Sequence, residues 1–193
     1  MFFFFHLLTG LILGFLVGDL LQDRRWFLPC AAGAILPDLI DKPLGYLLFP
    51  DTLGYGRVYS HTILVAILIL VLGLAIWNVA RDPGVIAVGV GILSHQALDM
   101  MWLQPVNWYY PLLGPFKGEM THDYLWTMFL AELSNPFELV LALVVAGIFL
   151  AVLYRKPIAD SIRKNRHGSA RFLAAAGLLL CCLTGILIGG GIM

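Results

Sequence analysis

The chain is 193 residues long, its formal net charge is zero, and 60% of its residues are hydrophobic while only 12% are charged. A soluble domain of this length carries about twice that charged fraction, so composition excludes an ordinary soluble protein. The absence of excess positive charge argues against a nucleic-acid partner. We therefore expect one integral membrane domain over residues 1–193, with the lipid bilayer as its partner and an all-α fold.

Long apolar stretches predict the membrane spans of this polytopic helical bundle. Stretches of about 20 apolar residues are long enough to cross a bilayer. They cover residues 2–21, 62–79, 84–103, 137–154 and 172–193. A sixth stretch, residues 26–49, brings the expected total to about five to six spans.

The stretch over residues 26–49 is unusual because it contains prolines and charges that a lipid-facing helix does not tolerate. They are Pro29, Pro37, Asp38, Asp41, Lys42 and Pro43. A broken crossing helix and a re-entrant segment lining a cavity both accommodate such residues. The basic loop over residues 155–171 should be cytoplasmic by the positive-inside rule. Counting back from it, only a broken but crossing segment keeps Arg24 and Arg25 inside, with both termini outside.

Aromatic side chains gather between the expected spans, around residues 104–132. They are Trp102, Trp108, Tyr109, Tyr110, Tyr124 and Trp126. Tryptophan and tyrosine favour the membrane–water boundary, so we expect an interfacial loop with short helices here. The chain then divides into two parts. Residues 1–118 carry the polar residues, and residues 119–193 contain a further stretch at the membrane boundary and the two C-terminal spans.

His95 and Asp99 stand inside an apolar stretch and are spaced four residues apart, which places them on one face of a helix. An imidazole and a carboxylate are costly in hydrocarbon and should face a protein interior, a cavity or an ion. A metal site is one explanation. A hydrogen bond between the two side chains that joins helices is the other.

The expected topology brings further polar residues to the same depth, in the outer half of the bundle. The candidate metal ligands are His6, Asp38, Asp41, His61, His95 and Asp99. Histidine and aspartate together suit Zn, with Mn or Fe as alternatives, better than Ca or Mg. Such a site can hold one divalent metal ion, or two that share a carboxylate.

Two of the polar residues are candidates for direct roles in catalysis. Asp41, if it lies outside the ligand shell, can act as a general base. Arg57 precedes His61 by four residues in a glycine-containing loop and can bind an anionic group such as a phosphate. A solvated loop charge is the alternative for Arg57.

Several short motifs occur in a characteristic order. They are HLLTG at 6–10, LPDLID at 36–41, RVYSHT at 57–62, GILSHQALD at 91–99 and WYYP at 108–111. Together they resemble the membrane-bound metal-dependent hydrolase family, which includes LexA-regulated inner-membrane hydrolases. The resemblance covers residues 1–118 and implies an inner-membrane location, with the six candidate ligands as the site positions. Two residues separate Asp38 from Asp41 where the family often has one, and Gly56 replaces a histidine of the family pattern.

Three functions are compatible with these residues. The first is a hydrolase in which metal-activated water attacks an ester or phosphoester of an amphiphilic, lipid-like substrate near the outer leaflet. The second is a metal-ion or proton transporter or channel, which requires polar residues that continue to the cytoplasmic side. Few are present there, namely Asp19, Asn78 and Thr184. The third is a scaffold whose polar cluster only fixes helix packing. The sequence leaves the substrate and the oligomeric state open.

Overall fold

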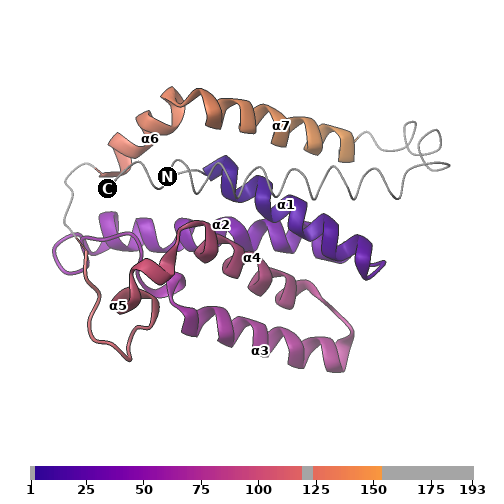
Figure 1. The fold of residues 1–193 in the computed structure, drawn as a ribbon, viewed down its shortest axis with the longest axis horizontal. Helices are drawn as coiled ribbons and strands as arrows, with labels where there is room; N and C mark the ends of the chain where they lie inside the picture. The colour runs from indigo at the N-terminus through magenta and orange to yellow at the C-terminus, as the bar shows by residue number, and fades with distance from the viewer. Residues whose placement is uncertain (1–2, 119–123, 154–193) are drawn as a thin grey trace.

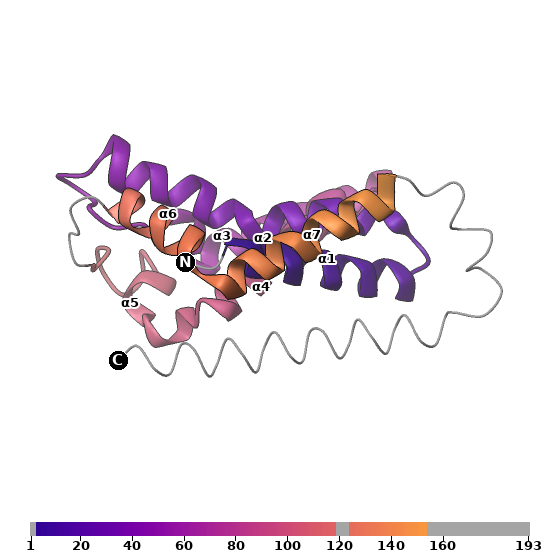
Figure 2. The same ribbon diagram turned by 90° about the horizontal axis from the view of Figure 1, so that it is seen from above.

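A computed structural model describes residues 3–118 and 124–153, and all regular elements in these stretches are helical. The all-α prediction is confirmed for this part of the chain. The long helices run roughly along one axis (Figures 1 and 2). They are α1 (Phe3–Leu20), α2 (Phe27–Pro43), α3 (Ile63–Ala80), α4 (Gly84–Leu98) and α7 (Pro136–Leu153). Shorter elements are η1 (Arg24–Trp26), η2 (Leu44–Leu48), η3 (Tyr59–His61), η4 (Met101–Leu103), α5 (Pro105–Trp108) and α6 (Tyr124–Ser134).

Helix α2 lies at the centre of the bundle, packed against both α1 and α4. Helix α3 packs against the outer side of α4, and α7 packs against α1. Short connections join α1 to α2 and α3 to α4, so the helices of each pair run in opposite directions. The start of α1, the end of α2, the start of α3 and the end of α4 therefore meet at one end of the bundle, which we call the site end.

The number of membrane spans is smaller than the predicted five to six. Among the described residues, α1 and α3 are long and apolar enough to cross a bilayer. Helices α6 and α7 count as a third span only if they act as one broken helix, because they meet at 78°. The charges in α2 and the shortness of α4 remove these two helices from the count. The predicted basic loop at 155–171 and the span at 172–193 lie outside the described residues.

Helix α4 ends at Leu98, five residues earlier than predicted, for a backbone reason. Met100 adopts a left-handed conformation with φ of 50°, which an α-helix cannot accommodate, and Pro105 follows shortly after. Helix α2, in contrast, continues through Pro37 and changes to a π-helical turn only at Leu44. The interruption predicted for residues 26–49 therefore falls at the end of α2.

Two glycines allow α2 and α4 to approach closely. A Cβ atom on Gly33 would lie 2.1 Å from the carbonyl oxygen of Val88, and one on Gly91 would lie 2.2 Å from that of Cys30. Small residues at helix contacts are typical of membrane proteins, where backbone packing replaces the hydrophobic driving force. This approach brings the end of α4, with His95, against the backbone of α2.

The start of α1 is held by two glutamates that the sequence analysis did not single out. Glu132 of α6 accepts a hydrogen bond from the backbone of Phe3 at 2.5 Å, and Glu138 of α7 accepts one from Phe4 at 2.9 Å. The first turn of a helix has unpaired N–H groups and a positive dipole end, which carboxylates stabilise. Acidic residues in an apolar stretch were the signal that could have revealed them.

We predict that Gly91→Ala destabilises the protein because its new methyl group collides with the backbone of α2. Overpacking of this kind costs about 1–3 kcal/mol. Thermal unfolding in detergent should show a lower midpoint for Gly91→Ala. The matched control is Gly147→Ala, since a Cβ atom at Gly147 meets nothing within 4 Å. Equal midpoints for the two variants would contradict the close helix contact.

Candidate metal centre

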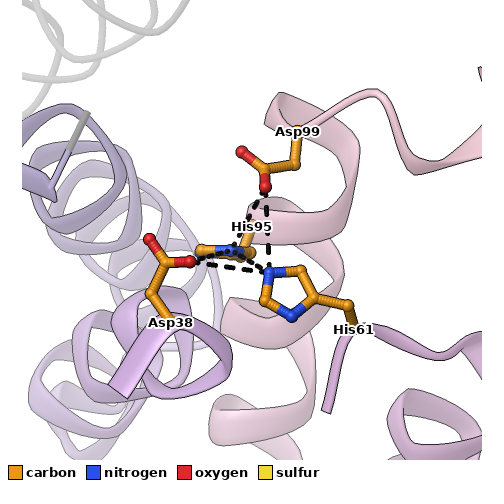
Figure 3. Close-up of side chains that lie close together, drawn as sticks. All are labelled: Asp38, His61, His95 and Asp99. Atoms are coloured by element: carbon orange, nitrogen blue, oxygen red, sulfur yellow. Dashed lines mark hydrogen bonds and ion pairs between the residues drawn. The ribbon is translucent and has the colours of Figure 1, made fainter. Parts of the chain in front are cut away.

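Four side chains from three parts of the chain meet at the site end (Figure 3). Asp38 comes from α2, His61 from the turn η3 before α3, and His95 from the last turn of α4. Asp99 follows directly after α4. One ligand atom from each residue lies within 4.8 Å of the corresponding atoms of the other three. These two imidazoles and two carboxylates are four of the six ligands that the sequence predicts, and together they could hold a metal ion.

Asp41 determines the orientation of His61. Its Oδ2 lies 2.7 Å from His61 Nδ1 and accepts hydrogen bonds from the backbone of Val58 and His61, at 2.9 and 3.1 Å. Its Oδ1 accepts one from the backbone of Ser60 at 3.0 Å. A carboxylate that already accepts from several N–H groups is best satisfied when Nδ1 also donates to it. Nε2 of the neutral His61 ring then carries only a lone pair.

The backbone of α2 fixes His95 in the same way. Its Nδ1 lies 2.7 Å from the carbonyl oxygen of Ala34. A carbonyl oxygen can only accept, so Nδ1 carries the hydrogen and Nε2 of the neutral ring has none. Both rings are completely buried. A histidine that donates one nitrogen to a carboxylate or carbonyl and presents the other is the usual arrangement of a metal ligand.

The presented atoms converge on one point. The two Nε2 atoms are 3.1 Å apart, and Asp38 Oδ1 lies 3.6 and 3.7 Å from them. Asp99 Oδ2 lies 3.8 and 3.9 Å from the same nitrogens. None of these four atoms has a hydrogen to offer the others, and Asp38 Oδ1 has no hydrogen-bond partner among the described residues. Tetrahedral zinc ligands are separated by about 3.3 Å, so the donor set fits a metal ion.

The outward-facing carboxylate, Asp99, has two further neighbours. Its Oδ1 lies 3.2 Å from Nε2 of His6, and its Oδ2 lies 2.8 Å from Nε of Arg57. Burial opposes ionisation of Asp99, but the hydrogen bond with His6 and the charge of Arg57 outweigh it and hold the pKa of Asp99 well below its usual range. Asp99 therefore stays charged.

The pKa of His61 is shifted by the same kind of competition. Burial opposes protonation of the ring, but the contacts with Asp38 and Asp41 outweigh it and raise the pKa of His61. Without a metal ion, one proton shared between His61 and His95 can hold the two Nε2 atoms together. In the alternative without a metal ion, this shared proton is what allows the cluster to join the helices.

Charge balance inside the cluster also favours an added cation. Asp38, Asp41 and Asp99 contribute three negative charges. Lys42 forms a buried ion pair with Asp38, and Arg57 pairs with Asp99. These two cations leave one negative charge uncompensated in a buried site, which is costly in a medium of low dielectric constant. Of the two carboxylates that precede Lys42 in α2, it is Asp38, four residues earlier, that pairs with it.

All seven residues singled out for the site lie at the site end. Asp38, His61, His95 and Asp99 form the group that can hold the ion. His6 adjoins it from α1, where its ring stacks on His95 with centroids 4.1 Å apart. Asp41 stands behind His61, and Arg57 lies beside Asp99. Sequence reasoning missed Gln96, a buried amide in the same apolar helix, although polarity in an apolar stretch was again an available signal.

A helical bundle with buried ionisable residues and apolar outer faces defines a class, the α-helical integral membrane proteins. The comparison with family models is more specific. The model described as YdjM inner membrane protein matches residues 1–189, so the chain belongs to this family and lies in the inner membrane. The match extends well beyond residues 1–118, to which the sequence motifs were confined. Neither the curated proteins nor the solved structures contain a match.

We predict that the purified protein carries about one equivalent of a divalent transition metal, because the four converging atoms are the number of ligands in a tetrahedral site. His95→Ala and Asp38→Asn should each abolish the bound metal, because each removes a ligand atom from the converging set. Elemental mass spectrometry measures the metal content. The matched control is Asp51→Asn, which alters an exposed loop carboxylate and should retain the metal. A metal-free, folded wild type after reconstitution would leave the shared proton as the better explanation.

Proposed function

We propose that this protein is a membrane-embedded metal-dependent hydrolase that cleaves an ester or phosphoester of an amphiphilic substrate near the outer leaflet. The observation that carries the proposal is the convergence of two bare imidazole nitrogens and two carboxylate oxygens, a donor set that could hold a metal ion. When bound, a divalent ion (Zn first, Mn or Fe as alternatives) supplies Lewis acidity and activates water near neutral pH.

The proposed roles of the site residues follow from how deeply each one is buried. Asp38, His61 and His95 are buried and hold the ion from the interior of the bundle. The side chain of Asp99 is 14% exposed, so the open side of the site is the side of Asp99. In this scheme the ring of His6 would take up the proton released by water, and Asp99 Oδ1, 3.2 Å from His6 Nε2, would stabilise the resulting imidazolium.

Asp41 takes a different role from the general base that the sequence suggested. Its two oxygens already receive hydrogen bonds from three backbone N–H groups and from the ring of His61. Both oxygens are occupied by these hydrogen bonds, so neither is left to face a water molecule or a substrate. We therefore assign Asp41 the positioning of His61.

Arg57 is the residue that we assign to substrate binding. Its side chain is about one-third exposed (34%) and reaches Asp99 from the loop before η3. A guanidinium beside the open side of the site favours a substrate with a phosphate or another anionic group, through charge-assisted hydrogen bonds. The exposed aromatic and aliphatic residues of the neighbouring segment, among them Trp102 and Leu103, suit the apolar part of such a substrate.

The distribution of buried polar residues favours a one-sided site over a transport pathway. No polar side chain is buried in residues 10–37 or 63–94 of the described chain. The buried polar side chains of α1, α2 and α4 all lie towards the site end of these helices. A pathway for ions or protons needs polar groups that continue across the bundle. Arg24, Arg25 and Arg81 lie at the opposite end, which the positive-inside rule places in the cytoplasm.

We predict that Arg57→Gln raises the KM for phosphate-containing lipid substrates by about tenfold, because a charge-assisted hydrogen bond contributes about 1.5–3 kcal/mol. The metal content should stay near the wild-type level, since Asp38, His61 and His95 are unchanged. The measurement is product release from a panel of phosphoester and carboxylic ester lipids, followed by steady-state kinetics. Arg24→Gln, which alters an exposed cation at the opposite end of the bundle, is the matched control and should leave the KM unchanged.

The same preparation separates hydrolysis from transport. Removal of the metal with a chelator should abolish product release, and adding Zn, Mn or Fe should restore it. A metal-loaded protein that releases no product from the panel, and that instead moves metal ions or protons into vesicles, would overturn the hydrolase proposal in favour of a transporter.

A further inference from the structure

A single buried amide connects the loop around His61 to a neighbouring surface segment. The side chain of Gln96 is 1% exposed, and both its polar atoms are used. Its Nε2 donates to the carbonyl oxygens of Thr62 and Ser60, at 3.0 and 3.3 Å. Its Oε1 accepts a hydrogen bond from the indole Nε1 of Trp108 at 3.0 Å. The two carbonyls belong to the residues on either side of His61.

Trp108 belongs to residues 101–118, a stretch held together by its own hydrogen bonds and ring contacts, which we call the interfacial segment. Asn107 closes it by exchanging two hydrogen bonds with the backbone of Lys117, at 2.6 and 2.7 Å. The rings of Tyr110 and Phe116 stack with centroids 3.9 Å apart, and Tyr59 packs edge-on against both. The segment therefore rests directly on the loop that carries His61.

The outer side of the interfacial segment is apolar. Its exposed large side chains are Trp102, Leu103, Tyr109, Leu112 and Leu113. Exposed aromatic and leucine side chains beside a membrane bundle are typical of the bilayer boundary. The interfacial segment thus has one face suited to lipid and one face joined to the metal centre through Gln96.

His61 depends on such outside support because of its local structure. It ends the three-residue turn η3, so no helical ladder holds it in place. Asp41 binds the loop from the side of α2, through the backbone N–H groups of Val58, Ser60 and His61. Gln96 binds it from the side of α4, through the neighbouring carbonyl groups. The two residues hold opposite sides of one short turn.

We propose that Gln96 is a positioning residue through which the interfacial segment sets the position of His61 and hence the affinity of the metal centre. This inference rests on the proposed metal centre. Partners that orient a metal ligand without touching the ion typically contribute 10–100-fold to metal affinity. Gln96 touches neither the ring of His61 nor the ion, so its effect passes through the backbone of residues 60–62.

The test uses the full chain in detergent and measures the dissociation constant for Zn²⁺ by competition with a chelator. The visible spectrum of the Co²⁺-substituted protein reports the ligand geometry. Trp108→Phe removes only the indole donor and should weaken Zn²⁺ binding about tenfold and shift the Co²⁺ bands. Gln96→Glu keeps the acceptor for Trp108 but loses both donors to Ser60 and Thr62, and it should weaken binding at least as much.

Trp102→Phe is the matched control, because Trp102 lies in the same segment with its side chain exposed. It should bind Zn²⁺ like the wild type. Metal-free Trp108→Phe should unfold at a slightly lower temperature than metal-free Trp102→Phe, because the buried Oε1 of Gln96 loses its donor. The Co²⁺ bands, which report ligand geometry rather than stability, separate positioning from general stability. If Gln96→Glu does not fold, Trp108→Phe decides alone. Wild-type Zn²⁺ affinity and unchanged Co²⁺ bands in Trp108→Phe would overturn the positioning role. A wild type that binds no metal would instead overturn the metal centre itself.

Discussion

Four acceptor atoms that face one another in a buried site are the constraint on which the rest of the structure depends. The hydrogen bonds at Nδ1 of His61 and His95 leave both Nε2 atoms without a hydrogen, only 3.1 Å apart. The facing oxygens of Asp38 and Asp99 are acceptors as well. Lone pairs cannot satisfy one another in an apolar surrounding, so the cluster needs a cation or a shared proton. The one negative charge left after Lys42 and Arg57 have paired also attracts a cation, and metal analysis decides between the proton and the divalent ion.

The bundle brings these atoms together by backbone contacts rather than by long flexible side chains. Gly33 and Gly91 let α2 and α4 approach closely enough for Ala34 to accept from His95. Asp41 gathers the turn before α3 against the end of α2. The glutamates of α6 and α7 hold the start of α1, one turn before His6. Each contact fixes a ligand through rigid backbone, which is how a site is held in its working geometry.

Membership of the YdjM inner membrane protein family places the chain in the inner membrane but does not by itself define a reaction. The proposed chemistry comes from the site. Buried ligands lie on the inner side of the cluster, and Asp99 and Arg57 lie on the open side. The interfacial segment, which follows Asp99 in the chain, exposes several large apolar side chains. The proposed substrate, with an anionic group and an apolar part, is suited to Arg57 and to these exposed apolar side chains.

The sequence by itself determined the membrane class and, to within one residue at each end, the helices α1, α3 and α7, because apolar composition over a helical length is a local property. It also named the seven polar residues that the fold brings to one end of the bundle. It overestimated α4, whose end depends on the backbone of Met100. The division of labour among the polar residues was decided only by tertiary structure. Asp41 binds backbone N–H groups instead of an ion because of contacts with a segment about 20 residues away. Lys42 pairs with Asp38 instead of Asp41 because of side-chain directions that spacing does not specify.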